Sequence, residues 1–518
     1  MHARDSSLKQ LLSEISSIFT QHNLRVYLVG GFIRDMMLGR ETNDVDISVE
    51  GGDALETAQI LASGTNGKYV VLDEVNRIAR VVLIGTTRPL YIDVTSFYGD
   101  IETDLAGRDF TIDAMAVDLQ DFLSGGTNLI DPFNGKGDLK KRTVRALRPD
   151  VFRQDGLRLL RAVRLAAELD FSIEPETELF IKENKSLIKA VSGERIREEL
   201  VKLFSVPGSS RYFSYIDELG LLSEIIPEIA YMKGVEQPKE HYWNVFDHSL
   251  KTIEAVDFLM REREWIVKER DLLQDVPWTD EIRAHFDRQV SGGSTRKLLL
   301  KFGALLHDIA KPQTKAIDEN GRMRFIGHPK QGADIAAVIC NRLRFSTRET
   351  KLVEHLVYYH LRPVQMSNTG MPTSRAIYRF YRDVGSDGTD ILFLALADFL
   401  ATAGPALNID EWHGQTQLIR YIMEEYGNQA TKRLPVKLID GEDIMECFGL
   451  TPGPLIGKLL DLVHEAQAAG DIGSRDEAIA LVRAELEKEN GGIGCFMPLN
   501  ILYSTDTTFY TDSMLKDF

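Results

Sequence analysis

The chain has 518 residues, 43% of them hydrophobic, and a formal net charge of −17 at pH 7. This length and composition provide for several domains with buried cores, and the acidic charge excludes a general nucleic-acid coat while leaving room for a local basic groove. The three cysteines are far apart and form no CxxC pattern, which argues against a disulfide framework. The N-terminus lacks a signal-peptide core and no run looks long enough to span a bilayer, so we expect a cytoplasmic protein without a membrane partner.

The stretch from Leu24 to Gly51 predicts a strand, a glycine turn at Gly30 and Gly31, a short helix and a second strand. Asp44 and Asp46 are two apart on the second strand, so their carboxylates project the same way. Paired like charges suit a Mg²⁺ ion that carries a triphosphate. The alternative is a chance acidic pair at a solvated strand end.

Two further strands are expected at residues 78–84 and 89–97, and Asp93 lies in the second. A buried-looking carboxylate in a strand is costly unless it is paired or binds a metal. Carboxylates from neighbouring strands could hold two Mg²⁺ ions for an in-line displacement on a nucleotide. Taken alone, Asp93 is more often a hydrogen-bonded structural residue.

A local reversal of charge follows: between residues 136 and 164, ten Lys or Arg stand against three Asp. This pattern favours a surface that faces phosphates, although a solvated basic helix face would show the same composition. The residues that we expect to contact RNA are Lys136, Lys140, Lys141, Arg142 and Arg145.

Residues 152–171 read as a helix in which Asp155 and Arg158 are three apart and share a face. A carboxylate accepts hydrogen bonds and a guanidinium donates several, so the two could read the Watson–Crick edge of a base. Arg161 and Arg164 extend the basic face. The alternative is an ordinary surface ion pair, which contributes little.

A second group of polar residues occurs on apolar helices in the middle of the chain. Imidazole and carboxylate ligands from several helices suit a divalent transition metal such as Mn, Ni or Fe, which makes hydroxide for attack on a phosphoester. Each histidine alone is more often a satisfied helix residue. The set comprises His248, His307, Asp308, His328, His355, His360 and Asp398.

Five segments resemble the class II tRNA nucleotidyltransferase and bacterial poly(A) polymerase family, in family order over roughly the first 205 residues. They are GGFIRD with DVD, RDFTIDAMA, DPFNGKGDLKKRTVRAL, FRQDGLRLLRAVRLAAELDF and GERIREELVKLF. The resemblance implies an α+β protein: a small polymerase β-like nucleotidyltransferase head with a mixed sheet, followed by an all-α neck, body and tail.

The resemblance also implies residue roles. Asp44 and Asp46 would hold Mg²⁺, with Asp93 as the third catalytic carboxylate. The triphosphate and sugar would contact Gly30, Gly31, Arg34 and Asp35, and the ribose would be oriented by Arg108 and Asp109. The incoming base would be read by Asp155 and Arg158, beside Arg161 and Arg164.

Several positions depart from the family pattern. The usual RRD reads Gly107-Arg108-Asp109, the usual asparagine after RDFTI is Asp113, and Gln154 replaces a glutamate. The stretch between Asp93 and Arg108 is short, whereas complete CCA-adding members carry a longer flexible loop there. Its loss resembles the CC-adding subgroup, unless another segment replaces it or the loop length simply varies.

The middle constellation resembles the HD-domain phosphohydrolase family. That pattern selects His360 and leaves His355 as a bystander. It implies a metal site with phosphatase or cyclic phosphodiesterase activity, useful for clearing blocked 3′ ends.

We therefore expect five parts. They are a catalytic head (1–149), a neck and body with the base-reading helix (150–235), an HD domain (236–405), a helical tRNA-binding tail (406–489) and an extension of unknown role (490–518).

The expected function is template-independent addition of C, and of A as an option, to tRNA 3′ ends from CTP or ATP, with CC addition favoured. Full CCA addition and poly(A) polymerization are the near alternatives. An HD phosphohydrolase whose head only binds RNA is the alternative from another class. Sequence leaves open whether the protein is a monomer or a homodimer.

Overall fold

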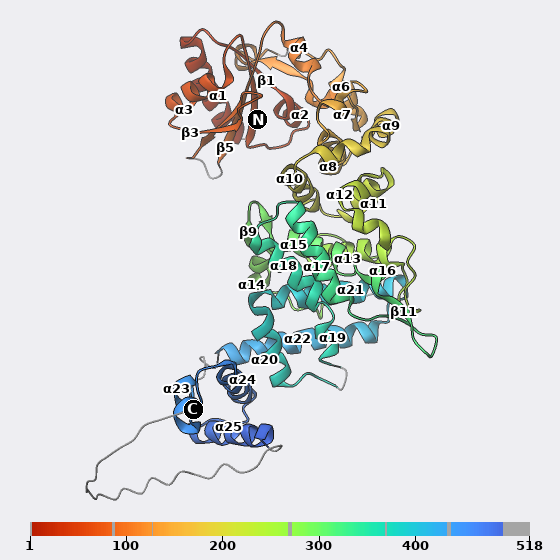
Figure 1. Ribbon diagram of the computed structural model, residues 1–518. Helices are drawn as coiled ribbons and strands as arrows, with labels where there is room; N and C mark the ends of the chain where they lie inside the picture. Colours follow the sequence, from red (N-terminus) through yellow and green to blue (C-terminus); the bar gives the residue numbers. More distant parts are fainter. Residues whose placement is uncertain are drawn as a thin grey trace, which may run out of the picture. The chain divides into compact units, whose positions relative to one another are not determined.

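The computed structural model describes residues 3–84, 89–126, 128–267, 272–367, 370–431 and 437–490 (Figure 1). The chain forms two compact units, which are described separately: the first comprises Met1–Met371 with Val384–Met423, and the second Pro372–Asp383 with Glu424–Phe518. The predicted extension at 491–518 lies outside the described residues. The five-part division stays a prediction.

A six-stranded mixed sheet forms the head and confirms the predicted fold class. Its strand order is β3-β4-β5-β2-β1-β6. The central pair β2·β5 is parallel, and the other neighbouring strands are antiparallel. The strands are β1 (Arg25–Val29), β2 (Asp44–Glu50), β3 (Lys68–Asp73), β4 (Ile78–Leu83), β5 (Leu90–Phe97) and β6 (Ala116–Asp118). β3 and the short β6 are additional to the strands that the sequence predicts.

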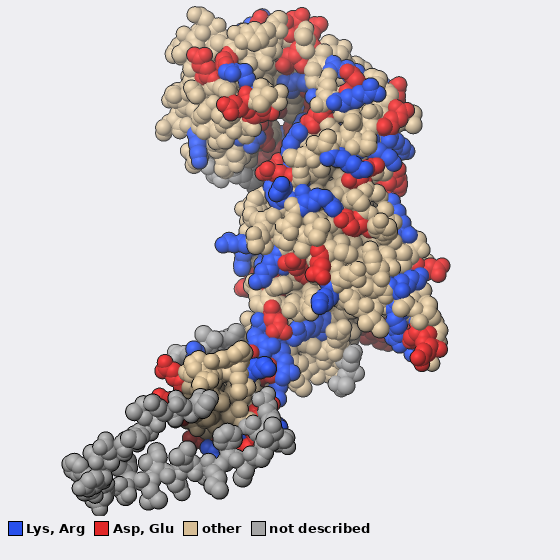
Figure 2. Space-filling model, in the orientation of Figure 1, with Lys and Arg blue, Asp and Glu red and all other residues tan. Residues whose placement is uncertain are grey.

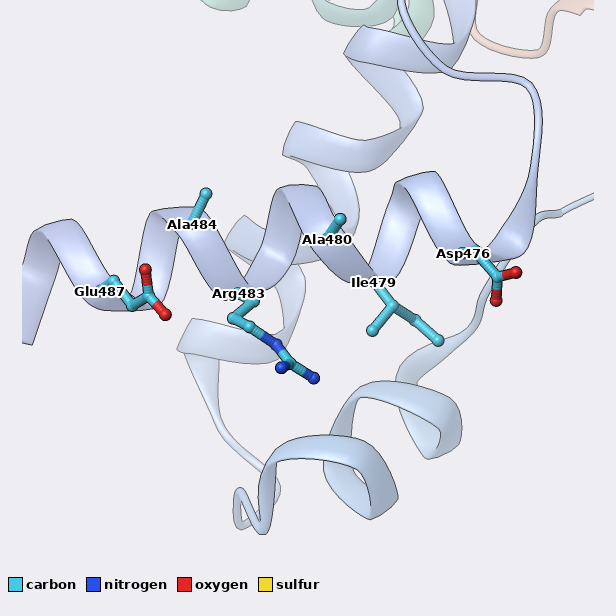
Figure 3. Close-up of a pocket in the computed structure, with 6 residues that line it drawn as sticks. All are labelled: Asp476, Ile479, Ala480, Arg483, Ala484 and Glu487. Carbon is cyan, nitrogen blue, oxygen red and sulfur yellow. The ribbon is translucent and has the colours of Figure 1, made fainter. Parts of the chain in front are cut away.

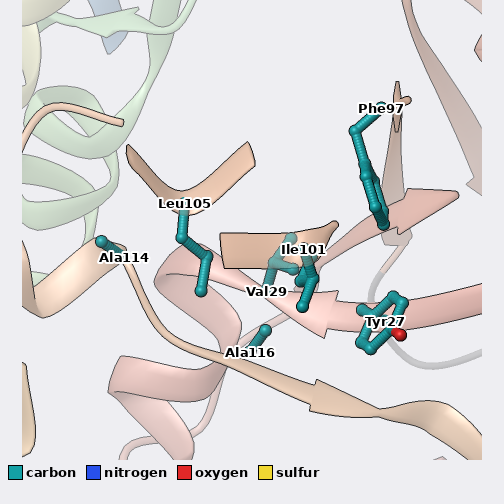
Figure 4. Packing of buried hydrophobic residues seen from close by; sticks show 7 residues of the cluster. All are labelled: Tyr27, Val29, Phe97, Ile101, Leu105, Ala114 and Ala116. Atoms are coloured by element: carbon teal, nitrogen blue, oxygen red, sulfur yellow. The ribbon is translucent and has the colours of Figure 1, made fainter. Parts of the chain in front are cut away.

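Short helices flank this sheet. They are α1 (Ala3–Gln21), α2 (Gly30–Met37), α3 (Ala54–Thr65), α4 (Ile101–Ala106), α5 (Leu119–Leu123) and α6 (Gly135–Lys141). Asp100 caps the start of α4, because its side chain accepts a hydrogen bond from the backbone amide of Thr103. Its Ile101 and Leu105 pack on Val29 and other residues of the sheet (Figure 4). The short connection after β5 is therefore an ordered, anchored segment.

The prediction of one helix over residues 152–171 is wrong in one respect. The structure has two helices there, α7 (Val151–Gln154) and α8 (Arg158–Leu169), with a break between them. Asp155 is extended, with φ −150° and ψ 111°. Gly156 lies so close to the next segment that a Cβ there would stand 2.5 Å from the carbonyl oxygen of Leu187. Asp155 and Arg158 are thus not on one face of one helix.

The rest of the first unit is mostly helical, and its last helix, α22 (Ile409–Thr431), continues past Met423 into the second unit. The neck and body contain α9 (Pro175–Asn184), α10 (Gly193–Phe204), α11 (Ser210–Glu218) and α12 (Leu221–Ile225). The HD region contains α13 (Val245–Leu259), α14 (Asp280–Asp287), α15 (Arg296–Leu306), α16 (Lys311–Thr314), α17 (His328–Arg342), α18 (Thr347–Tyr359), α19 (Arg362–Gln365), α21 (Gly388–Ala403) and α22 (Ile409–Thr431). Three two-stranded pairs complete it: β7 (Thr143–Val144) with β8 (Ser172–Ile173), β9 (Gln289–Ser291) with β10 (Ser294–Thr295), and β11 (Lys315–Ile317) with β12 (Met323–Phe325).

One helical stretch among the described residues, Ser374–Ala406, is long and apolar enough to cross a membrane. The prediction that no run has this length is therefore wrong. However, 61% of its apolar window is buried inside the protein. Within it, α21 packs against α13 and α15 as a core helix. Helices that are apolar all round are expected in such core positions.

The second unit combines α20 (Ser374–Val384) with α23 (Gly441–Phe448), α24 (Pro454–Ala469) and α25 (Arg475–Asn490). The last three helices share a core that includes Ile444, Leu459 and Val482. Glu465 of α24 is buried and accepts from Arg379 and Arg382 of α20, at 2.6 and 2.8 Å.

Candidate active sites

The head site begins where the glycine turn after β1 meets β2. The amide of Phe32 donates to Oδ2 of Asp46 at 3.3 Å. A Cβ at Gly30 or Gly31 would lie 3.3 or 3.2 Å from the same oxygen, and Gly30 has φ +66°. The positive φ of Gly30 favours glycine at that position, and a Cβ at either position would crowd this carboxylate. Burial raises the pKa of Asp46, so its charge is held at a cost that a bound cation would offset.

Asp93 is brought beside this pair by strand register. On the parallel neighbours β2 and β5, Asp46 pairs with Asp93. On the other side, Arg80 of β4 pairs with Asp93 and donates to its two oxygens at 2.6 and 2.8 Å. The donors of Asp44, Asp46 and Asp93 are all carboxylate oxygens, which is the ligand type that Mg²⁺ prefers.

A buried ion-pair network lies under the site. Arg34 of α2 donates from Nη1 to Oδ1 of Asp113 at 2.6 Å and from Nε to Asp35 at 3.0 Å. Arg161 of α8 lies 2.7 Å from Asp109 and 3.8 Å from Asp113. The network therefore links the head to the neck, and Arg34 is already neutralized by two carboxylates.

Burial alone would raise the pKa of Asp113, but Arg34, Arg161 and further arginines outweigh it and hold that pKa below its ordinary value. The carboxylate is therefore ionized in this network.

Arg108 is the guanidinium that faces the glycine turn. A Cβ at Gly30 would lie 2.6 Å from its Nη1. Its positive charge partly offsets the burial effect on the pKa of Asp46. Nη2 lies 3.3 Å from Asp104 at the end of α4. Arg108 thus lies beside Asp46 at the glycine turn, and its contact with a nucleotide stays a prediction.

The expected base-reading residues lie at the break between α7 and α8, and each has a partner. Asp155 accepts from Arg195 of α10 at 2.6 and 3.2 Å, and from the amide of Leu157 at 3.0 Å. Arg158 donates to Gln154 at 3.0 Å and to the carbonyl of Gly107 at 3.2 Å. The pair is held by neighbours, not by one another.

The second site lies among the HD helices and is centred on Asp308, which follows α15. Its Oδ2 lies 3.2 Å from Nε2 of His307 and 3.6 Å from that of His248. Its Oδ1 lies 3.4 Å from Nε2 of His328 and 3.8 Å from that of His360. Each carboxylate oxygen thus faces its own histidine pair. Among the described residues, the groups that could hold a metal ion are His248 with His307 and Asp308, and Asp308 with His328 and His360.

Three histidines of this site turn Nδ1 toward the backbone. Nδ1 of His307, His328 and His360 lies 2.7–2.8 Å from a carbonyl oxygen three residues earlier. The Nε2 atoms face the carboxylate, and in a neutral ring whose Nδ1 donates to the backbone, Nε2 keeps a lone pair for a metal. Both oxygens of Asp308 are buried without a well-directed hydrogen bond within the described structure, although the Lys311 ammonium lies 2.7 Å from Oδ2. This donor set fits divalent cations.

Asp398 of α21 completes the first half of this site, with Oδ1 3.0 Å from Nε2 of His248. Burial alone would lower the pKa of His307, but Asp308 and Asp398 outweigh it and raise that pKa to about 10, so the site favours positive charge. Burial, with charged His307 nearby, lowers the pKa of His360 to about 3. His355 is elsewhere, paired with Asp387 at 2.9 Å, as expected of a bystander.

Comparison with known proteins identifies three matching domains in this chain. Residues 26–145 match the poly(A) polymerase head domain, residues 170–233 a probable RNA- and SrmB-binding site of polymerase A, and residues 245–402 the HD domain. The chain is 31% identical to an A-adding tRNA nucleotidyltransferase of Deinococcus radiodurans, over 90% of this chain and 96% of that protein. The chain belongs to the tRNA nucleotidyltransferase family. A CC-adding tRNA nucleotidyltransferase of Thermus thermophilus is 30% identical, over 88% and 92% of the two chains.

The fold of this family member is also that of the Thermotoga maritima CCA-adding enzyme complexed with tRNA. The TM-score is 0.56 at 23% identity, over 94% of this chain and 97% of that chain. The recognition from sequence and the predicted class of enzyme, a nucleotidyltransferase, are confirmed. The residue roles stay predictions.

Some residues expected to contact nucleotide or RNA in this tRNA nucleotidyltransferase are engaged elsewhere. Arg164 is buried and donates to Glu199 of α10 and to Glu168, both at 2.5 Å. Arg142 pairs with Asp170, and Arg145 with Asp138 and Glu174. Lys136, Lys140 and Lys141 on α6 are exposed. We therefore propose a bracing role for Arg164 and keep the three lysines as the RNA-contacting candidates.

Two further arginines of this family member, Arg80 and Arg195, touch the site but were not predicted. Arg80 could have been found only from the strand register, and Arg195 only from the packing of α10. Acidic and basic side chains are interspersed over the face in view (Figure 2). A hollow of about 300 Å³ runs along α25 between Asp476 and Glu487 (Figure 3), and we assign it no role.

Proposed function

We propose that this protein adds C residues to tRNA 3′ ends from CTP without a nucleic-acid template. The observation that carries the proposal is the position of Asp46 against the glycine turn, with Asp44 two residues before it on β2 and Asp93 paired with it on β5. Mg²⁺ bound by these carboxylates would polarize the α-phosphate and the attacking 3′-hydroxyl. The chain itself supplies a fixed turn, a guanidinium at Arg108 and a rigid sheet that hold the triphosphate in line.

The base would be selected by protein groups at the α7–α8 break. Cytosine and adenine each present an amino donor beside a ring-nitrogen acceptor, whereas uracil and guanine present a carbonyl beside a ring N–H. Asp155 can accept from the amino group and Arg158 can donate to the ring nitrogen. Gly107 and Gln154 hold Arg158, and Arg195 holds Asp155. This arrangement accepts C or A and rejects U or G.

We infer CC addition from the anchored connection between β5 and Arg108. Its α4 is tied to the sheet through Ile101 and Leu105. A segment so short and packed leaves little length for the movement that would refit the site from CTP to ATP. One relative is named A-adding and another CC-adding, so the relatives' names support tRNA as the substrate and leave the nucleotide to experiment.

The test uses tRNA transcripts that end before CCA, after one C, or after CC, with CTP, ATP or both. We expect two C residues on the first transcript, one on the second and no A on the third. Addition of A to the transcript ending in CC would exclude CC addition, and efficient ATP use on arbitrary RNA would favour poly(A) polymerization.

We also propose a second function, hydrolysis of phosphoesters at RNA 3′ ends, for the HD site. The observation in its favour is the two-sided Asp308, with one histidine pair at each oxygen. His248, His307, Asp308 and Asp398 would hold one divalent cation, and Asp308, His328 and His360 a second. Such ions lower the pKa of bound water and clamp a phosphoryl group.

The substrate to try is a tRNA transcript with a 2′,3′-cyclic phosphate or a 3′-phosphate end, in Mn²⁺, Ni²⁺ or Fe²⁺. We expect release of phosphate by the intact chain and loss of at least about 100-fold for Asp308→Asn, which removes the shared ligand charge. Equal rates for the intact chain and Asp308→Asn would refute an HD hydrolase.

A further inference from the structure

Arg80 is the basic side chain nearest to the third catalytic carboxylate. It donates from Nε and Nη2 to the two oxygens of Asp93 at 2.6 and 2.8 Å, and its guanidinium lies 5.1 Å from the ring centroid of Tyr91. Its side chain is 31% exposed, so the pair is at the edge of the site and not in the core. A fork-to-fork pair of this kind fixes both the position and the rotation of the carboxylate.

The same charge acts on the other two carboxylates. The hydrogen bond to Asp93, together with the charges of Asp93, Asp44 and Asp46, raises the pKa of Arg80 against its partial burial. Burial raises the pKa of Asp44, and the charge of Arg80 offsets only part of that rise. Three like charges on neighbouring strands would repel, and Arg80 is the cation that offsets them from the β4 side.

The carboxylates are not drawn together to metal-binding distance. The clusters with all ligand atoms within 4.8 Å of one another, among the described residues, are both in the HD region. Arg80 instead holds the two oxygens of Asp93. A cation that needs an oxygen of Asp93 has to compete with this guanidinium.

We propose that Arg80 is a positioning residue of the nucleotidyl-transfer site, which holds Asp93 and competes with the divalent cation for it. This inference rests on the proposed function of the head. Competition from Arg80 gives the site a low affinity for the free divalent cation. The cation therefore enters together with the triphosphate, whose negative charges offset the repulsion by Arg80.

The experiment uses the full chain with His307→Ala and Asp308→Asn, so that the HD site does not bind the probe. Free Mn²⁺ binding is measured by calorimetry or electron paramagnetic resonance for this parent, Arg80→Gln and Arg80→Lys. Arg25→Gln is the matched control, because Arg25 also pairs with an aspartate on a neighbouring strand, Asp118 at 3.0 Å, and lies 5.1 Å from a tyrosine ring.

Arg80→Gln is expected to bind free Mn²⁺ roughly tenfold more tightly, because a repelling unit charge is removed from a few ångströms away. Its kcat for C addition in Mg²⁺ is expected to fall about tenfold with the KM for CTP nearly unchanged, since Asp93 is no longer held. Arg80→Lys keeps the charge and should bind Mn²⁺ like the parent while recovering part of kcat. Arg25→Gln should change neither.

An Mn²⁺ affinity of Arg80→Gln equal to or weaker than that of the parent overturns the inference. Asp44→Asn with Asp46→Asn separates this failure from a failure of the proposed function. If that double variant still adds C, the head carboxylates are not the catalytic site and the proposed function fails. If it loses both C addition and Mn²⁺ binding while Arg80→Gln binds like the parent, only the role of Arg80 is refuted.

Discussion

At the scale of single residues, Asp113 shows how much one side chain can connect. Its oxygens face Arg34 of the head and Arg161 of the neck, and its side chain is 4% exposed. The family pattern usually has an asparagine at this position. An asparagine would keep the shape of the side chain and lose its charge. Arg34 would retain Asp35, and Arg161 would retain Asp109. The substitution should therefore remove the ion pairs of Asp113 and leave those of Arg34 with Asp35 and of Arg161 with Asp109.

We expect Asp113→Asn to lower the free energy of unfolding by about 1–3 kcal/mol at pH 7. The pKa of Asp113 is lowered in the folded protein, so its contribution is present above the unfolded value of 3.8 and is lost as the pH falls further. The difference between variant and wild type should be constant from pH 7 to about 4 and shrink below. Urea unfolding across this range measures it, and a difference that grows on acidification would contradict the assignment.

At the scale of elements, the break between α7 and α8 decides how the base-reading side chains are presented. Apolar spacing predicts one helix, and it correctly predicts α8. It cannot reveal that Gly156 approaches the carbonyl of Leu187, because that contact depends on how the next segment packs. The same limit explains Arg195 and Arg80: their partners are set by helix packing and strand register, which apolar periodicity does not show.

We expect Gly156→Ala to destabilize the protein by about 1–3 kcal/mol, because a Cβ 2.5 Å from a backbone oxygen forces the backbone to move. The shift should also disturb Asp155 and lower the rate of CTP addition. The matched control is Gly414→Ala in α22, where a Cβ meets nothing within 4 Å. That change should stabilize by about 0.5–1 kcal/mol. Thermal unfolding and C-addition rates compare the two, and equal behaviour would refute the packing argument.

At the scale of the whole molecule, motifs with a fixed order were the most informative part of the sequence. They predict four of the head strands that the structure contains, and they propose Asp44 with Asp46 and a set of HD ligands, because these features are local in the sequence or follow the family order. They do not show that Asp308 faces two histidine pairs, nor that Arg164 is buried against α10. Both facts depend on helices that meet only in the folded chain.

The two sites differ in ligand chemistry, oxygen donors in the head and mixed nitrogen and oxygen donors in the HD region. After chelation and dialysis, Mg²⁺ alone should restore C addition, while phosphoester hydrolysis should require Mn²⁺, Ni²⁺ or Fe²⁺. Asp46→Asn should abolish only the first activity and Asp308→Asn only the second. Loss of C addition in Asp308→Asn at an unchanged unfolding temperature would mean that the sites are not independent.

The most direct measurement of the central claim is single-nucleotide incorporation from each of the four triphosphates into tRNA lacking CCA. Wild type, Asp155→Ala and Asp44→Asn with Asp46→Asn are compared. Wild type is expected to use CTP and to exclude UTP and GTP. In Asp155→Ala, the ratio of kcat/KM for CTP to that for UTP should fall about 10- to 100-fold because the acceptor for the amino group is lost, and the double variant should incorporate nothing. An unchanged ratio in Asp155→Ala, or incorporation by the double variant, would contradict base selection by Asp155 or catalysis by the head carboxylates.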